Sequence, residues 1–138
     1  MKNSGSNTEV PARLWRFIHE CDWTKARELL AEGFEARWPQ TRERIVGREN
    51  YIKLNRDYPG NHRIELLESD GYWDEDKQQT KVTTQVYIAS KMPDGTEMKL
   101  FAVSLFDVNR GGLITRAVEY WADCGEAPAW RRSLVEIY

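Results

Sequence analysis

The sequence has little of what would mark a membrane span, a nucleic-acid surface or a metal centre. Across its 138 residues, no apolar run approaches the roughly 18 residues of a transmembrane helix. Its 20 basic and 22 acidic residues are interspersed and give a net charge of −2. The sequence therefore has no block of basic residues that could bind along the phosphates of a nucleic acid. His19 and His62 have no companion ligands at metal spacing. We expect no membrane span, no nucleic-acid partner, no metal and no cofactor.

Cysteine is also scarce, and the start of the chain lacks a targeting signal. Cys21 and Cys124 lie far apart and outside any Cys-x-x-Cys spacing. Two free thiols in a reducing compartment explain them better than a bridge, which the sequence leaves open. The opening residues MKNSGSNTE lack the apolar core of a signal peptide. We therefore expect a cytoplasmic protein with a disordered lead, 1–9, and a single domain, 10–138.

Aromatic residues, in contrast, are plentiful, with six Trp, six Tyr and four Phe. In the first half of the chain, apolar residues recur at helical spacing. This half predicts a helix from Pro11 to Cys21, a helix over 23–32 capped by Asp22 and ended by Gly33, a strand over 34–38, a polar loop over 40–44, and a third helix that follows Ile45-Val46-Gly47 and ends at Pro59-Gly60.

The second half predicts strands. They cover 62–73, with a bulge near 69–71, then 81–91, 98–108 and 113–121, and the turns at 93–95 and 109–112 join them as antiparallel hairpins. A short helix or arm over 128–136 follows. Helices that precede such a meander predict an α+β layer with the helices on one side of an antiparallel sheet.

The strand from Leu100 to Asp107 carries apolar residues on both of its faces. An antiparallel sheet usually has one solvated face, and the helices can cover only the other. We therefore predict a homodimer through the outer sheet face. An ordinary apolar surface, or a tail folded across it, is the alternative.

Four segments carry a family resemblance that covers the chain from Val10 to Glu136. They are Cys21-Asp22-Trp23, Phe34-Glu35-Ala36-Arg37-Trp38-Pro39, Ile45-Val46-Gly47-Arg48-Glu49 and the stretch from Leu113 to Asp123, which ends in Glu119-Tyr120-Trp121-Ala122-Asp123. In these segments the chain resembles the nuclear transport factor 2-like superfamily, and within it the SnoaL-like domains. The resemblance implies an α+β cone: a strongly bent antiparallel sheet, three N-terminal-half helices on its concave face, a deep cavity and frequent dimerisation through the sheet. Since the superfamily includes isomerases, dehydratases, epoxide hydrolases, polyketide cyclases and non-catalytic binders, it implies no particular reaction.

The acid and base groups of one activity in this superfamily are missing. Alignment with ketosteroid isomerases places Trp38 at their general-base aspartate, Leu14 at or beside their oxyanion tyrosine and Ser104 at their protonated aspartic acid. Only Trp121 matches a pocket-wall aromatic. Proton abstraction beside a carbonyl by that machinery is therefore not expected.

Strand parity indicates a candidate site instead. If Trp121 faces the cavity, a period of two puts Glu119, Ala117 and Thr115 on the same face. Glu119 is then a carboxyl in an aromatic enclosure, where desolvation raises the pKa and favours a catalytic acid or base. Alternatively Glu119 is structural, ion-paired with an arginine or satisfied by a tyrosine hydroxyl. The predicted ligand-binding residues are Trp15, Trp38, Tyr51, Asn55, Tyr58, Ser104 and Trp121.

These residues predict a small-molecule pocket protein that binds an apolar or aromatic metabolite. If it is an enzyme, a lyase, isomerase or hydrolase that uses Glu119 without a cofactor fits best. A hypothesis of another class is a non-catalytic, dimeric interaction domain whose cavity is filled by its own side chains. The sequence leaves both open, and with them the question of whether the protein is an enzyme.

Overall fold

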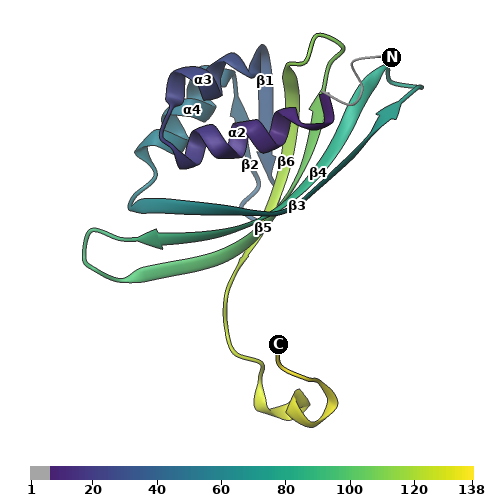
Figure 1. Ribbon diagram of the computed structural model, residues 1–138. Helices are drawn as coiled ribbons and strands as arrows, with labels where there is room; N and C mark the ends of the chain where they lie inside the picture. Colours follow the sequence, from purple (N-terminus) through teal and green to yellow (C-terminus); the bar gives the residue numbers. More distant parts are fainter. Residues whose placement is uncertain (1–6) are drawn as a thin grey trace.

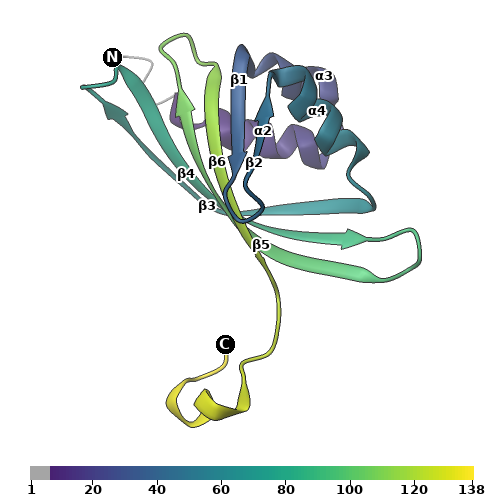
Figure 2. The same ribbon diagram turned by 180° about the vertical axis from the view of Figure 1, so that it is seen from behind.

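The domain consists of one curved sheet and a group of helices that cover one face of it, as Figure 1 shows and Figure 2 repeats from behind. The computed structural model describes residues 7–138. Its six strands follow the order β2-β1-β6-β5-β4-β3. Along the chain the elements are α2 (Val10–His19), α3 (Trp23–Glu28), β1 (Leu30–Trp38), β2 (Glu43–Val46), α4 (Arg48–Asp57), β3 (Asn61–Asp74), β4 (Gln79–Lys91), β5 (Glu97–Val108), β6 (Ile114–Asp123) and the 3₁₀ helix η1 (Ala129–Leu134).

The predicted α+β layer is confirmed, because α2, α3 and α4 lie on one side of a strongly bent sheet. One pairing is parallel rather than antiparallel: β1 runs alongside β6, with Ala36 beside Ala117. This pair joins the first strand of the chain to the last. No turn connects them, so no local signal in the sequence could reveal their pairing.

The second helix is shorter than predicted, although its start is as expected. The Asp22 carboxylate caps it by accepting from the Lys25 amide at 3.2 Å. The helix ends at Glu28, and β1 already begins at Leu30. The expectation that Gly33 terminates the helix is therefore wrong, since this glycine lies inside β1.

Pairing with the last strand ends this helix early. Leu30 is fully buried and pairs with Ile114 of β6. The Ile114 amide donates to the carbonyl of Leu29 at 2.9 Å. A tertiary strand partner thus overrides the helical propensity of the segment around these leucines.

Two smaller expectations about the strands also need correction. Part of the predicted loop over 40–44 belongs to β2, a four-residue edge strand paired with β1 through Arg44 and Arg37. The irregularity of β3 falls between Leu66 and Glu68, ahead of the predicted 69–71. Short charged edge strands and bulges carry weak sequence signals, because little of their surface is buried.

Residues 1–6 of the predicted lead lie outside the described part of the chain. Asn7 is buried, and its amide donates to the carbonyls of Asn109 and Arg110 at 3.3 and 3.4 Å, so ordered structure precedes Val10. Within residues 7–138, no helix is long and apolar enough to cross a membrane.

The core lies between the helices and the concave face of the sheet. Trp15 of α2 anchors it: its indole N–H donates to the Thr84 hydroxyl at 2.9 Å, and its ring meets Phe106 edge-on at 6.4 Å. Leu14 and Phe34 beside it are fully buried. Full burial of one such side chain contributes about 1.5–3 kcal/mol to the stability of the fold. These buried side chains therefore hold α2 against the sheet.

At Gly71, the backbones of β3 and β4 approach each other closely. A methyl group at Gly71 would lie 2.7 Å from the Lys81 carbonyl oxygen, whereas one at Gly33 would meet nothing within 4 Å. We expect Gly71→Ala to lower the free energy of unfolding by about 1–3 kcal/mol, because backbone must move. Gly33→Ala, the matched control, should change it by less than about 1 kcal/mol. Urea unfolding followed by tryptophan fluorescence measures both, and equal stabilities would contradict the close approach.

Candidate functional site

A cavity of about 100 Å³ lies between the helices and the concave face of the sheet. Its walls are mostly aromatic and aliphatic, and polar groups are confined to a few positions. The residues that line it are Trp15, Ile18, Trp38, Tyr51, Asn55, Tyr58, His62, Ile64, Ile88, Ser90, Leu100, Ala102, Glu119 and Trp121.

The Glu119 carboxyl is the central polar group of this cavity and is 5% exposed. Its Oε1 accepts from the Trp38 indole N–H at 3.0 Å and from the Tyr51 hydroxyl at 3.1 Å. Its Oε2 accepts from the Ser104 hydroxyl at 2.8 Å. Because these donors come from β1, α4 and β5, a single carboxyl on β6 joins the sheet to the helix above it.

The site contains a carboxyl without a cation. No Lys or Arg side chain belongs to the cavity lining in the described part of the chain. Burial raises the pKa of Glu119 above its usual value, and the hydrogen bonds from Trp38, Ser104 and Tyr51 act in the opposite direction. Burial and the neighbouring Glu119 also raise the pKa of the Tyr51 hydroxyl well above its usual value. Tyr51 therefore keeps its proton and remains a donor.

Aromatic rings form two sides of the cavity. Trp38 and Trp121 meet edge-to-face with ring centroids 4.9 Å apart. Phe34 supports the Tyr51 ring from behind at 4.8 Å. Since edge-to-face pairs add about 0.5–1.5 kcal/mol beyond their burial, these contacts hold the walls in place.

Asn55 bonds to its own helix. Its side-chain amide donates to the backbone carbonyl of Tyr51 at 2.9 Å. Asn55 also belongs to the residues that line the cavity. Trp15 likewise contributes a wall rather than a donor, because its N–H is bonded to Thr84.

The structure brings the predicted ligand-binding residues together at the cavity, with the exception of Ser104, which lies behind Glu119 and donates to it. Strand parity placed Trp121 and Glu119 on the helix side of the sheet, as observed. The same alternation was expected to continue to Thr115, and there it fails. The β5–β6 register shifts after Asp107, so Ile114 takes the buried position instead.

A pair that the sequence analysis did not single out lies at another part of the cavity. The Nδ1 of His62 is 2.5 Å from the Ser90 hydroxyl, and its Nε2 is 3.3 Å from the Tyr58 carbonyl. The carbonyl can only accept, so in the neutral form of the ring Nε2 carries the proton and Nδ1 accepts from the serine. Parity could have revealed the pair, because Ser90 alternates with the cavity residue Ile88, and His62 with Ile64.

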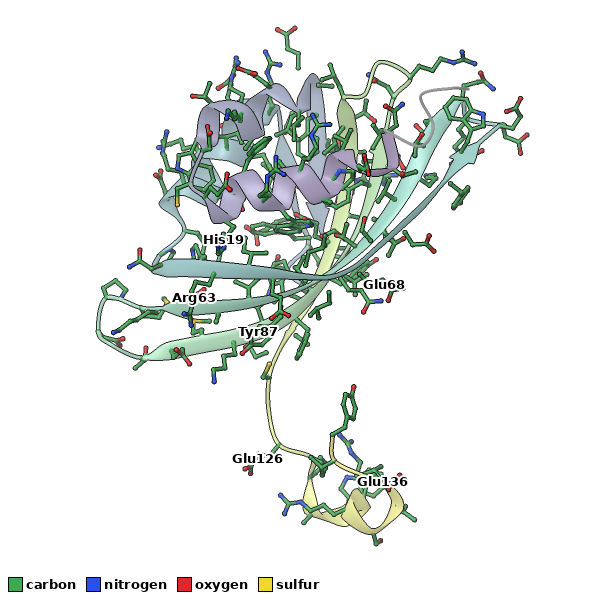
Figure 3. All side chains as sticks on the ribbon, in the orientation of Figure 1. His19, Arg63, Glu68, Tyr87, Glu126 and Glu136 are labelled. Carbon is green, nitrogen blue, oxygen red and sulfur yellow. The ribbon has the colours of Figure 1, made fainter. Side chains whose placement is uncertain are left out.

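His19 fulfils a structural role at the edge of the sheet. Its Nδ1 accepts from the Ile64 amide at 3.0 Å and so ties the end of α2 to the edge strand β3 (Figure 3). Among the described residues, no cluster of His, Cys, Asp or Glu side chains is arranged to hold a metal ion.

Comparisons with known proteins support the fold. No protein-family model matches the sequence, and no curated protein does. A protein from Kribbella flavida DSM 17836 that carries a provisional name as a ketosteroid isomerase is 25% identical, with a TM-score of 0.77, over 99% of this chain and 92% of its own. A Mycobacterium tuberculosis protein in complex with estradiol-17beta-hemisuccinate is 16% identical, with a TM-score of 0.66, over 82% of this chain and 91% of its own.

A third solved structure belongs to the same group. A protein from Xanthomonas campestris pv. campestris, provisionally named a polyketide cyclase, is 20% identical, with a TM-score of 0.64, over 86% of this chain and 91% of its own. The chain thus has the fold of the nuclear transport factor 2-like superfamily, with helices on the concave face of an open, mixed sheet. The resemblance to SnoaL-like domains is confirmed at the level of this fold.

Removal of the Glu119 charge should change how stability depends on pH. The folded-state pKa of Glu119 lies above its ordinary value of 4.5. The stability that this carboxyl contributes is therefore complete below about pH 4.5 and is lost as the pH rises through the folded-state pKa. We expect the wild type to lose stability relative to Glu119→Gln as the pH rises above about 4.5. Thermal unfolding of both proteins at a series of pH values measures the effect, and a difference independent of pH would contradict it.

Proposed function

We propose that the protein binds a small, uncharged, apolar or aromatic molecule in this cavity, with Glu119 as the principal polar contact. The observation that supports this function is a buried carboxyl without a cationic partner in a cavity with mostly apolar walls. Burial of a carboxyl is costly unless its hydrogen-bonding groups are satisfied. Three protein donors stabilise it only in part, and a ligand donor can contribute the rest.

The hydrogen bonds of Glu119 leave room for such a donor. Each carboxylate oxygen can accept two bonds. If Tyr51 donates to Oε1, the nearer oxygen at 3.1 Å, then Oε2 accepts from Ser104 and keeps one further position. A ligand alcohol, phenol or N–H fits this position. An anionic ligand does not fit, because Glu119 would repel it and no Lys or Arg among residues 7–138 lines the cavity.

The size of the cavity limits the ligand further. A space of about 100 Å³ is smaller than the roughly 150 Å³ of an engineered cavity that admits benzene. A single ring therefore requires a small displacement of the walls, and a polycyclic molecule requires the Trp38–Trp121 contact to open. The Mycobacterium tuberculosis protein of the same fold is in complex with estradiol-17beta-hemisuccinate, and the estradiol part of that molecule supports a ligand of apolar character, although its hemisuccinate part is an anion.

In the catalytic form of this proposal, Glu119 transfers a proton, and the Tyr51 hydroxyl, which donates its one proton to Glu119, holds the carboxyl in place. A carboxyl with a raised pKa is suited to acid or base catalysis near neutral pH. Such a site could serve a lyase, an isomerase or a hydrolase without a cofactor. The proton-transfer group then stands on β6, and Trp38 occupies the β1 position that an aspartate takes in ketosteroid isomerases.

A second candidate function is a non-catalytic interaction domain. The small volume of the cavity and the closed contact between Trp38 and Trp121 favour it, because side chains that fill a cavity leave the surface as the functional part.

We also infer a homodimer that forms through the outer face of the sheet. On this face β5 and β6 expose a run of apolar side chains, which we call the outer apolar strip: Phe101, Val103, Leu105 and Tyr120. Tyr87 of β4 extends the strip, since its ring lies 5.1 Å from that of Phe101. Contiguous exposed apolar surface of this kind marks an interaction site.

Two cavity variants test the binding proposal. Ala102 lines the cavity, so Ala102→Leu should fill it and abolish the thermal stabilisation by neutral aromatic alcohols and phenols. Glu119→Gln should weaken the same ligands at least tenfold, or about 1.4 kcal/mol. Ala12→Leu, on the partly exposed side of α2, is the matched control. Binding that is equal in all variants would exclude this cavity, and the absence of any ligand would favour the interaction domain.

Two exposed valines on different parts of the sheet test the dimer proposal. Val103→Glu introduces a charge into the outer apolar strip, and Val46→Glu introduces the same charge on the edge strand β2. Because burial of an unpaired charge is costly, we expect Val103→Glu to be monomeric and Val46→Glu to remain dimeric. Light scattering coupled to size-exclusion chromatography distinguishes them. Identical masses for the two variants would contradict the proposed interface.

A further inference from the structure

The last residues of the chain leave the domain as a separate segment, the C-terminal arm, residues 125–138. Figure 1 shows this arm extending away from the sheet, on the side opposite to the helices. The Cys124 amide still donates to the Lys99 carbonyl at 2.9 Å. Beyond it, the hydrogen bonds and ion pairs found in the described part of the chain stay within the arm.

The arm nevertheless has a defined shape. It contains η1, and the Arg132 guanidinium donates to the Ala127 carbonyl at 3.1 Å and pairs with Glu126 at 3.9 Å. Its apolar side chains have no cover. Trp130 is 74% exposed, Leu134 76% and Ile137 75%. Large apolar side chains presented by an ordered segment indicate a surface that binds another surface.

The same chain offers a surface of matching character. The outer apolar strip is uncovered, and Figure 3 shows Tyr87 and Glu68 on the side of the sheet that faces away from the helices. Beside the strip, the register of β3 with β4 places the acidic residues Glu65, Glu68 and Asp70 on this same face. The arm carries Arg131 and Arg132 next to Trp130, so apolar and charged groups correspond on the two surfaces.

We propose that the C-terminal arm packs on the outer sheet face of a second copy of this chain, and that two copies exchange their arms reciprocally. This inference rests on the proposed dimer and specifies what holds it together. The arm starts at the end of β6, where Asp123 pairs with Leu100 next to the outer apolar strip. In a two-fold dimer, the start of each arm is then close to the matching face of the other copy.

The reach of the arm is sufficient for this exchange. Residues 125–138 can span at most about 50 Å when extended, and neighbouring strands lie about 4.8 Å apart. The arm can therefore cross from β6 over the acidic strand β3 of the partner. In its own domain, the arm points away from the sheet that it would have to cover.

A photo-crosslinking experiment on the full chain tests the exchange directly. Trp130 is replaced with p-benzoylphenylalanine, and the light variant is mixed with isotopically heavy variant before irradiation. We expect covalent dimers that join light to heavy chains, with the attachment in peptides of β4, β5 or β6. Crosslinks confined to single chains would show that the arm folds onto its own domain and would overturn the proposal.

A second measurement separates the arm from the dimer itself. Sedimentation analysis is carried out on the wild type, on the double variant Trp130→Glu with Ile137→Glu, and on Ser133→Glu, a control that adds a single negative charge within η1. We expect the double variant to weaken dimerisation at least tenfold and the control to change it less than about threefold. Unchanged dimerisation of the double variant overturns the arm exchange and leaves the sheet dimer intact. A wild type that is monomeric at every concentration overturns both.

Discussion

The structure depends on one buried carboxyl and on the side chains that donate to it. Glu119 joins the last strand to β1 through Trp38, to α4 through Tyr51 and to β5 through Ser104. The three contacts fix the helix above the sheet and thereby define the cavity. Since no Lys or Arg of the described residues lines the cavity, hydrogen bonds stabilise the carboxyl, and burial raises its pKa.

Glu119 therefore serves both the structure and the proposed function. A carboxyl that only held elements together could be replaced by apolar side chains at little cost to stability. A carboxyl that lines a cavity, keeps an acceptor position and has a raised pKa has in addition the properties of a binding or proton-transfer group. The fold supports this use but does not choose the reaction, since the superfamily places different chemistry in the same cone.

Much of the fold and of the site was accessible from the sequence, for reasons that particular residues show. Alternation along β6 predicted that Trp121 and Glu119 share the cavity side, because a period of two reports burial directly. The parallel pairing of β1 with β6, the early end of α3 and the shift near Ile114 were not predictable, since they depend on partners distant in the chain. The His62–Ser90 pair is different: alternation with Ile64 and Ile88 could have placed both residues on the cavity side, and only their contact depends on the register of β3 with β4. That the arm extends away from its own sheet is likewise a property of the folded chain.

The most direct test of this account is an NMR titration of the Glu119 side-chain carboxyl, with ¹³C detection and assignment through Glu119→Gln. A cation-free carboxyl buried in an apolar cavity should titrate clearly above its ordinary value of 4.5. Addition of a neutral ligand with a hydroxyl donor should then shift the ¹³C resonance of this carboxyl. A midpoint at or below the ordinary value, with a resonance that no ligand moves, would contradict the account.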